Sequence, residues 1–213
     1  MKSKIKKIAL FGTSADPPTS GHKKIIQELS KKYKLVICYA SNNPSKNHTE
    51  NLFFRSLLLE KLICNFDNPQ IIFDQYLSSP WAITSIKRCK VKYSPDQIDF
   101  IIGSDLISEM FTWKNINQIM NEVKFIIIPR EGYLIEEKYL LRITENNGDF
   151  EVSDIKIPKI SSSMIRENSE HFGLPQSLVS IVKNNNLYDF KNNIENLSRT
   201  NQSCSWRLER KCS

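Results

Sequence analysis

A loop of small and polar residues follows the first apolar run of the chain and leads into a segment with helical spacing. The apolar run is Ile8–Phe11 and the loop is Gly12–His22. A turn between a buried strand and a helix start presents backbone N–H groups and the positive end of the helix dipole to an anion. Pro17 and Pro18 fix φ within this loop. The sequence therefore predicts a phosphate site close to the amino terminus.

His22 ends this loop at the expected first turn of the helix, where backbone N–H groups lack partners within the helix. An imidazole at that place can face the same anion. A capping or packing role for this histidine is the alternative.

A second cluster of hydroxyls and a guanidinium lies far along the chain, in Ile160–Arg166. Ser161, Ser162 and Ser163 stand at an expected helix start, and Arg166 lies one turn inside it. A planar guanidinium that swings back over the helix end can converge with hydroxyls and amides on a polyphosphate. Capping of the helix by serine is the alternative.

A third segment, Phe100–Asp105, is a strand that ends in Gly103 with a carboxylate just beyond it. The carboxyl ends of parallel strands form the rim of the crevice where ligands bind. Asp105 therefore either borders a ligand or caps the next helix.

The elements that would position these segments alternate along the chain. Short apolar runs, typical of buried strands, are Ile8–Phe11, Leu35–Tyr39, Ile71–Phe73, Phe100–Ile102 and Phe125–Ile128. Helices are expected at about 21–32, 50–65, 80–91, 104–121 and 174–187, and a further strand at 150–157. This alternation predicts the α/β class, with a Rossmann-like, open, mostly parallel sheet and helices on both of its faces.

The 213 residues are expected to form one domain over 1–190, followed by a basic, polar tail over 191–213. The tail has no sustained periodicity, which predicts poor order or loose docking, with an interaction role as the alternative.

Composition limits the compartment and the partners. No apolar run approaches the about 20 residues that a membrane-spanning helix needs, and the basic start of the chain lacks an export signal. The cysteines are odd in number and scattered: Cys38, Cys64, Cys89, Cys204 and Cys212. We therefore expect a cytoplasmic protein with free thiols and no membrane partner. The net charge of +7 comes without an arginine-rich stripe, which favours small anionic ligands over nucleic acid.

Together these segments resemble the nicotinate/nicotinamide mononucleotide adenylyltransferase family, within the wider class that carries a Thr-or-His, any residue, Gly, His signature. Thr19–His22 matches that signature, Ile160–Arg166 matches the second phosphate motif, and Phe100–Asp105 with Trp113 matches the central segment. The end of the domain, Leu174–Tyr188, resembles the closing helix of the family. The resemblance covers most of residues 5–190.

The resemblance implies a reaction in which AMP passes from ATP to nicotinate mononucleotide, or to nicotinamide mononucleotide, with Mg²⁺ on the phosphates. The dinucleotide and pyrophosphate are the products. The acceptor phosphate attacks the α-phosphorus directly, so positioning and charge neutralisation replace a protein nucleophile. The implied partners are these small nucleotides. Whether the protein forms a homo-oligomer stays an open question.

The resemblance also implies roles for individual residues. The catalytic group consists of His22, Thr19 and Arg166. The other residues expected to bind ATP are Gly12, Thr13, Ser14, Gly103, Asp105, Ser162 and Ser163. The residues expected at the mononucleotide are Lys46, Arg55, Trp81 and Trp113. Trp113 as a core aromatic and Lys46 as a solvated lysine are the alternatives.

The chain departs from the family at several of these positions. The common loop reads Gly-Gly-Thr-Phe-Asp-Pro-Pro-His, whereas this chain has Thr13 for the second glycine, Ala15 for phenylalanine and Thr19 for histidine. Pro80–Thr84 and Ser45 also differ, and these positions border the expected pyridine pocket. The choice between nicotinate and nicotinamide therefore stays open. A transferase acting on phosphopantetheine, a cytidylyltransferase, and a nucleotide-binding regulator without turnover are the alternatives.

Overall fold

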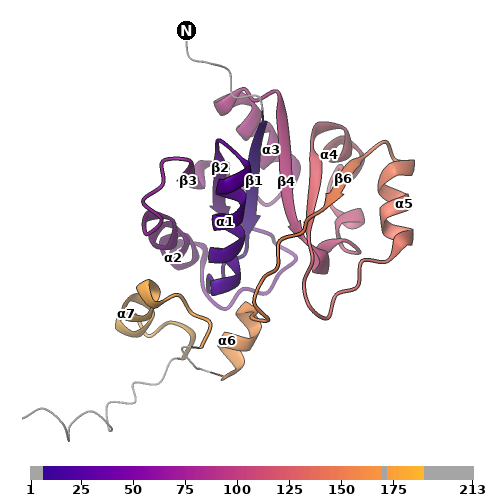
Figure 1. Cartoon of the computed structure of the whole chain (residues 1–213). Coiled ribbons are helices and arrows are strands. Elements are labelled where there is room, and N and C mark those ends of the chain that lie inside the picture. Colours follow the sequence, from indigo (N-terminus) through magenta and orange to yellow (C-terminus); the bar gives the residue numbers. More distant parts are fainter. Residues whose placement is uncertain (1–6, 169–171, 190–213) are drawn as a thin grey trace, which may run out of the picture.

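A six-stranded, all-parallel open sheet forms the centre of the computed structural model, which describes residues 7–168 and 172–189 (Figure 1). Its strands are β1 (Lys7–Thr13), β2 (Val36–Ala40), β3 (Ile71–Phe73), β4 (Gln97–Gly103), β5 (Lys124–Ile128) and β6 (Asp149–Val152). Their order is β3-β2-β1-β4-β5-β6, and every neighbouring pair is parallel. The predicted fold class is confirmed, while the expected tail at 191–213 lies outside the described residues.

Seven helices accompany the sheet in the described part of the chain. They are α1 (Ser20–Lys32), α2 (Leu52–Cys64), α3 (Ala82–Tyr93), α4 (Ile116–Glu122), α5 (Glu137–Glu145), α6 (Ser162–Asn168) and α7 (Gln176–Asn184). Buried side chains of α1, α2 and α7 belong to one core cluster, and those of α3, α4 and α5 to the other. Successive residues of a strand point to opposite faces of the sheet and pack in different clusters, as Leu10 and Phe11 of β1 do. Helices therefore cover both faces of the sheet.

The two central strands separate at their carboxyl ends. The last paired residues of β1 and β4 are Leu10 and Phe100. Beyond them β1 continues to Thr13 beside β2, and β4 continues to Gly103 beside β5. This is the point where the strand order reverses, and a crevice opens there in doubly wound sheets.

The expected single helix over 104–121 is wrong. The structure has two 3-10 turns, Ser104–Leu106 and Met110–Thr112, before the short helix α4. Asn115 adopts the left-handed conformation, with φ of 58°, and this breaks the helical path.

Two other boundaries differ from the prediction, and one helix was not predicted. The strand expected over 150–157 ends at Val152, because its partner β5 ends at Ile128 and is followed by a proline without an N–H group. The helix expected over 174–187 is shorter, since Asn186 has a positive φ. Helix α5 was not predicted, although its apolar residues Tyr139, Leu140 and Ile143 recur at helical spacing and pack against the core.

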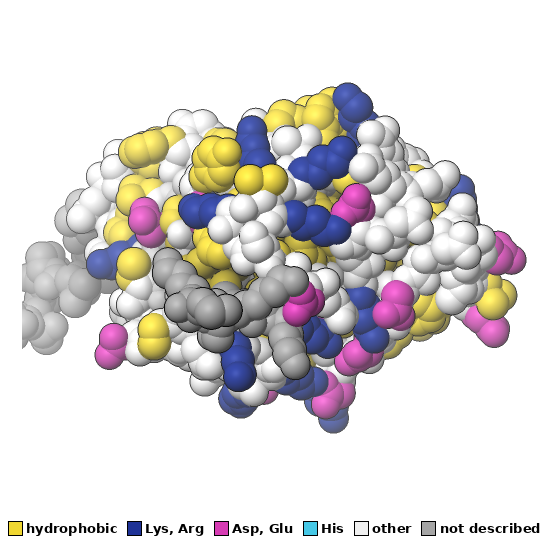
Figure 2. All heavy atoms as spheres, turned by 90° about the horizontal axis from the view of Figure 1, so that it is seen from above, with side chains coloured by type: hydrophobic (Ala, Val, Ile, Leu, Met, Phe, Trp, Pro, Cys, Tyr) yellow, Lys and Arg dark blue, Asp and Glu magenta, His cyan; other side chains and the backbone are white. Residues whose placement is uncertain are grey.

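The surface at the top of Figure 1, where the chain enters β1, carries interspersed basic and acidic side chains (Figure 2). Ion pairs near the end of α3 join Lys90 to Glu122 and Lys92 to Asp74. Within the part of the chain that the structure describes, no helix has the length and apolarity to cross a bilayer. Cys38 and Cys89 are buried and Cys64 is exposed, and all three are free thiols.

Candidate active site

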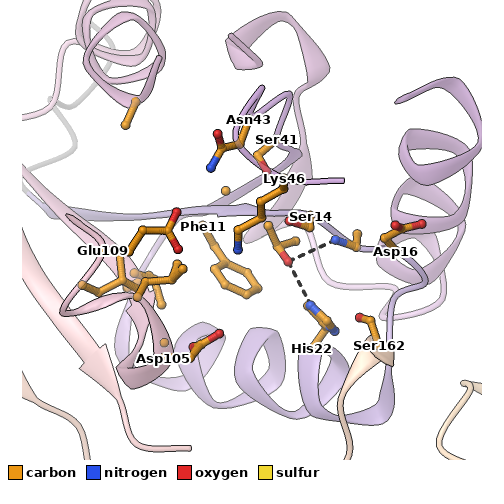
Figure 3. A pocket seen from close by; sticks show the side chains of 18 of the residues that line it. Phe11, Ser14, Asp16, His22, Ser41, Asn43, Lys46, Asp105, Glu109 and Ser162 are labelled. Atoms are coloured by element: carbon orange, nitrogen blue, oxygen red, sulfur yellow. Dashed lines mark hydrogen bonds between the residues drawn. The ribbon is translucent and has the colours of Figure 1, made fainter. Parts of the chain in front are cut away.

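A cavity of about 670 Å³ opens where β1 and β4 separate, at the carboxyl edge of the sheet. It is lined by the loops after β1, β2 and β4, by the start of α3 and by the segment that leads into α6. All candidate residues but one line it, namely Gly12, Thr13, Ser14, Thr19, His22, Lys46, Trp81, Gly103, Asp105, Trp113, Ser162, Ser163 and Arg166. Figure 3 shows Lys46, His22, Asp105 and Ser162 pointing toward this common space.

Two glycines of the cavity leave room for neighbouring side chains. A Cβ atom on Gly12 would lie 2.5 Å from the ring of Tyr39. A Cβ atom on Gly103 would lie 2.2 Å from the carboxylate of Asp105. Both distances are far below a van der Waals contact, so the close approach of these side chains requires glycine.

His22 is fixed by the cap of its own helix. Thr19 is the N-cap of α1 and His22 is the third helical residue, and their side chains and backbone form a reciprocal capping box. The backbone N–H of Thr19 donates to His22 Nδ1 over 3.0 Å, and the Thr19 hydroxyl lies 2.9 Å from the same nitrogen. His22 therefore caps its helix and also lines the cavity, two roles that the sequence analysis treated as alternatives.

The acceptor role of Nδ1 decides where the ring carries its proton. A nitrogen that accepts a backbone N–H has no hydrogen of its own, so the neutral ring is protonated at Nε2. Nε2 lies 2.9 Å from Thr13 Oγ1, a contact drawn as a dashed line in Figure 3. Burial and the positive charge of Arg130 lower the pKa of His22 to about 4. The residue is thus a neutral hydrogen-bond donor at pH 7.

This low pKa predicts a stability loss in acid for the ligand-free protein. The unfolded chain, in which histidine has its ordinary pKa of 6.5, binds a proton in a range where the folded chain does not. The contribution is complete above pH 6.5, falls as the pH drops toward 4 and amounts to about 3 kcal/mol of unfolding free energy. Urea titrations between pH 4 and 7 measure it.

His22→Gln is the matched variant for this measurement, because glutamine cannot titrate. It should flatten the pH dependence of the unfolding free energy, although the lowered pKa of His48 leaves a residual slope of the same sign. An unchanged slope in His22→Gln would contradict the assignment.

The two distant segments that the sequence predicts to bind anions meet at the loop after β1. The Arg166 guanidinium donates to the carbonyl oxygen of Asp16 over 2.5 Å, and the Ser162 hydroxyl donates to that of Pro17 over 2.8 Å. The first turn of α6 is therefore held against the loop that carries His22.

The side chain of Asp16 fixes a further loop. Its carboxylate accepts the backbone N–H groups of Thr49, over 2.7 Å, and of Glu50, over 3.2 Å. The loop between β2 and α2 carries Lys46, whose amine points into the cavity in Figure 3. Asp16 therefore links the segment of His22 to the segment of Lys46.

The structure places Arg55 outside the cavity, which corrects its expected contact with the mononucleotide phosphate. Its side chain is 1% exposed and donates to the carbonyl oxygens of Ser14, Ser41 and Glu50 over 2.7–3.0 Å. The guanidinium thus ties together the two loops that line the cavity. Its spacing from Leu58 and Leu62 places it on the buried face of α2.

Sequence reasoning missed Arg130, which forms an ion pair with Asp105 at 2.7 Å. Arg130 comes two residues after the end of β5, at the same sheet edge as Asp105. The argument that selected Asp105, a charged side chain just beyond a buried strand, would also have selected this arginine. Tyr133, Glu109 and Lys114 also line the cavity without having been predicted.

Trp113 lies at the margin of the core and also lines the cavity, while its expected contact with the mononucleotide stays a prediction. Its ring packs edge-to-face on Phe100, with 6.3 Å between centroids, at the margin of one core cluster. The same residue lines the cavity. The amine of the next residue, Lys114, lies 4.8 Å from the ring centroid of Trp81.

Comparison with known proteins agrees with this geometry. The Cytidylyltransferase-like family model matches residues 10–168. A probable nicotinate-nucleotide adenylyltransferase of Synechocystis sp. is 30% identical over 198 residues, which cover 85% of this chain and 98% of that protein. The chain belongs to the nicotinate-nucleotide adenylyltransferase family. It is therefore a nucleotidyltransferase.

Other nicotinate-nucleotide adenylyltransferases resemble the chain over a similar extent. The nicotinate-nucleotide adenylyltransferase of Bacillus subtilis is 26% identical over 199 residues, covering 87% of this chain and all of that protein. The structure of Plasmodium falciparum nicotinic acid mononucleotide adenylyltransferase complexed with NaAD superimposes with a TM-score of 0.70 at 22% identity. That alignment covers 87% of this chain and 98% of the other, and it supports the fold.

Proposed function

We propose that the chain transfers the adenylyl group of ATP to nicotinate mononucleotide in NAD biosynthesis, giving nicotinate adenine dinucleotide and pyrophosphate. The observation that carries this proposal is the hydrogen bond from Arg166 to Asp16, which spans 150 positions of the sequence. It brings a guanidinium to the cavity that His22 faces, and both groups are donors suited to a triphosphate. The names of the relatives supply the substrate class.

The reaction needs no covalent intermediate with the protein. An oxygen of the mononucleotide phosphate forms a bond to the α-phosphorus, and the bond from that phosphorus to the bridging oxygen breaks. The leaving pyrophosphate takes the electron pair. The work of the protein is to align the two phosphates and to neutralise charge as it develops.

The proposed roles follow the positions of the donors. The triphosphate lies between His22, with Ser14 beside it, and the first turn of α6 with Arg166 and Ser163. Thr19 acts through the His22 ring, whose Nδ1 it holds. Lys46 reaches the acceptor phosphate from the opposite loop.

The adenosine end of the substrate is proposed to lie beside Gly103. The cavity that contains the Asp105–Arg130 ion pair is also lined by apolar side chains, including Ile128 and Ile157. An apolar slot with a few fixed polar groups is the usual form of a site for a planar base.

We propose that Mg²⁺ arrives as part of the ATP complex, on the phosphates. Among residues 7–168 and 172–189, no group of three or more His, Cys, Asp or Glu side chains is arranged to hold a metal ion. When bound, the ion neutralises phosphate charge, and the protein contributes imidazole, ammonium and guanidinium donors to the same end.

The start of α3 supports a preference for nicotinate over nicotinamide. No side chain caps this helix end, and Trp81, Ala82 and Ser85 of its first turn line the cavity. The Ser85 side chain is buried, with 1% of the residue exposed, and interacts with the hydroxyl of Tyr39, which also lines the cavity. The free N–H groups, the dipole and the nearby Lys114 favour the carboxylate of nicotinate over a neutral amide.

Competition between the two acceptors tests this function. Purified protein with ATP, Mg²⁺ and equal concentrations of both mononucleotides should form the nicotinate dinucleotide in at least about tenfold excess, the ratio expected from about 1.4 kcal/mol of discrimination. Mass spectrometry measures both products.

Two results would reject the function. Product formed only from phosphopantetheine or with CTP would indicate another transferase of the same fold. Thermal stabilisation by ATP without any pyrophosphate release would indicate a nucleotide-binding regulator.

A further inference from the structure

Thr13 makes a contact that the common form of the loop cannot make. Thr13 lies at the end of β1 with 8% of its surface exposed, and its Oγ1 lies 2.9 Å from His22 Nε2. A glycine at this position has no hydroxyl to offer the ring. The contact is therefore a property of this chain, and it involves the ring of His22, a residue that lines the cavity.

The direction of this hydrogen bond follows from the other side of the ring. Because Nδ1 accepts from Thr19, Nε2 carries the hydrogen and donates to Thr13 Oγ1. The backbone N–H of Ala15 donates to the same oxygen over 3.3 Å. Both lone pairs of Thr13 Oγ1 are thus occupied, and its own O–H remains a donor on a residue that lines the cavity.

We propose that Thr13 is a positioning residue for adenylyl transfer. It holds the His22 ring by accepting a hydrogen bond from Nε2–H until a phosphate oxygen of ATP replaces it as the acceptor. The Thr13 hydroxyl then donates to the same phosphate. Thr13 and Thr19 hold opposite edges of the imidazole, so the ring keeps one orientation before substrate binds. This inference rests on the proposed function, since it assigns the phosphate to that cavity.

Preorganisation explains why the reaction benefits. A buried neutral ring without partners would either leave a polar N–H unsatisfied or rotate toward water. The Thr13 oxygen satisfies Nε2–H without fixing it permanently, because a charged phosphate is a stronger acceptor than a hydroxyl. The donor is therefore already placed when charge develops on the transferred group.

Kinetics of Thr13→Val and Thr13→Ser test the proposal. Valine keeps the shape and removes the hydroxyl, and it should lower kcat by about tenfold or more while the KM for the mononucleotide changes by less than about twofold. Serine restores the hydroxyl and should recover kcat to within about threefold of the parent. Thr144→Val, an exposed hydroxyl deletion on α5, is the control for the substitution itself.

A second readout does not depend on turnover. With ¹⁵N-labelled histidine the chain gives three ring systems, and His22 is assigned by its own substitution. The Nε2–H proton of His22 should be protected from exchange with water in the parent and in Thr13→Ser, and unprotected in Thr13→Val. Thr13→Ala replaces the valine variant if the latter does not fold.

Several results would overturn the proposal. They are a Thr13→Val enzyme with kcat within twofold of the parent, equal damage in the serine and valine variants, and an Nε2–H signal that stays protected without the hydroxyl. If the parent forms no dinucleotide, the proposed function fails, and the exchange measurement still decides whether Thr13 holds the ring.

Discussion

Replacing His22 with alanine should lower kcat for dinucleotide formation by about 10²–10³-fold, the usual effect of removing one preorganised donor from a developing charge. The ring of His22 caps α1, its Nε2–H contacts Thr13, and the residue lines the cavity. Its pKa of about 4 means that the neutral donor is the form present at the pH of the assay. Pyrophosphate release under saturating ATP and mononucleotide measures the change.

Loss of the cap could also weaken the fold, so His22→Ala needs a check on structure. A thermal melt and the KM values for both substrates separate the two effects, because a donor that acts mainly in the transition state alters kcat more than KM. Lys23→Ala, an exposed change at the next position of the same helix, is the matched control. A fall in kcat of less than about fivefold in His22→Ala would remove the imidazole from the mechanism.

Replacing Arg166 with alanine should reduce kcat/KM for ATP by about 10²-fold or more. The guanidinium has two tasks: one Nη1 hydrogen bond fastens the start of α6 to Asp16, and its other N–H donors remain for the triphosphate. Alanine removes both, so the segment of Ser162 and Ser163 loses a tether to the loop of His22. Initial rates at varied ATP measure the effect.

Arg166→Lys separates the two tasks. A lysine keeps the charge but lacks the planar fork, so it cannot donate to the carbonyl and to a phosphate in the same geometry, and it should recover less than about a tenth of the lost kcat/KM. Glu167→Ala, an exposed neighbour on α6, is the control. A kcat/KM for ATP within about threefold of the parent in Arg166→Ala would place the triphosphate elsewhere in the cavity.

Local sequence was sufficient for the sheet and for most of the cavity. The strand positions follow from short apolar runs, because a strand that is buried on both faces consists of nearly continuous apolar residues. The loop of His22 and the segment of Arg166 could be recognised separately, since each combines donors with a turn or a helix start. Both predictions depend only on residues close together in the chain.

Helix boundaries were less well determined. The apolar spacing over 104–121 suits one helix, but the left-handed Asn115 and two 3-10 turns take its place. Helix α5 was missed although Tyr139, Leu140 and Ile143 form an apolar face at helical spacing, a signal that was present in the sequence. Packing against the sheet, and not local preference, decides such cases.

Tertiary structure alone decided which side chains meet. Arg55 has the charge of a phosphate ligand, yet three backbone carbonyls from two separate loops surround it once α2 packs against the sheet. The pairing of Asp105 with Arg130 depends on β4 and β5 being neighbours. The contact of Thr13 with His22 depends on the turn that joins β1 to α1. The sequence by itself determined the types of donors and the strands that carry them. The partners of Arg166, Arg55 and Arg130 come from segments far apart in the chain, which no local pattern records, whereas His22 finds its partners Thr13 and Thr19 close by in the sequence.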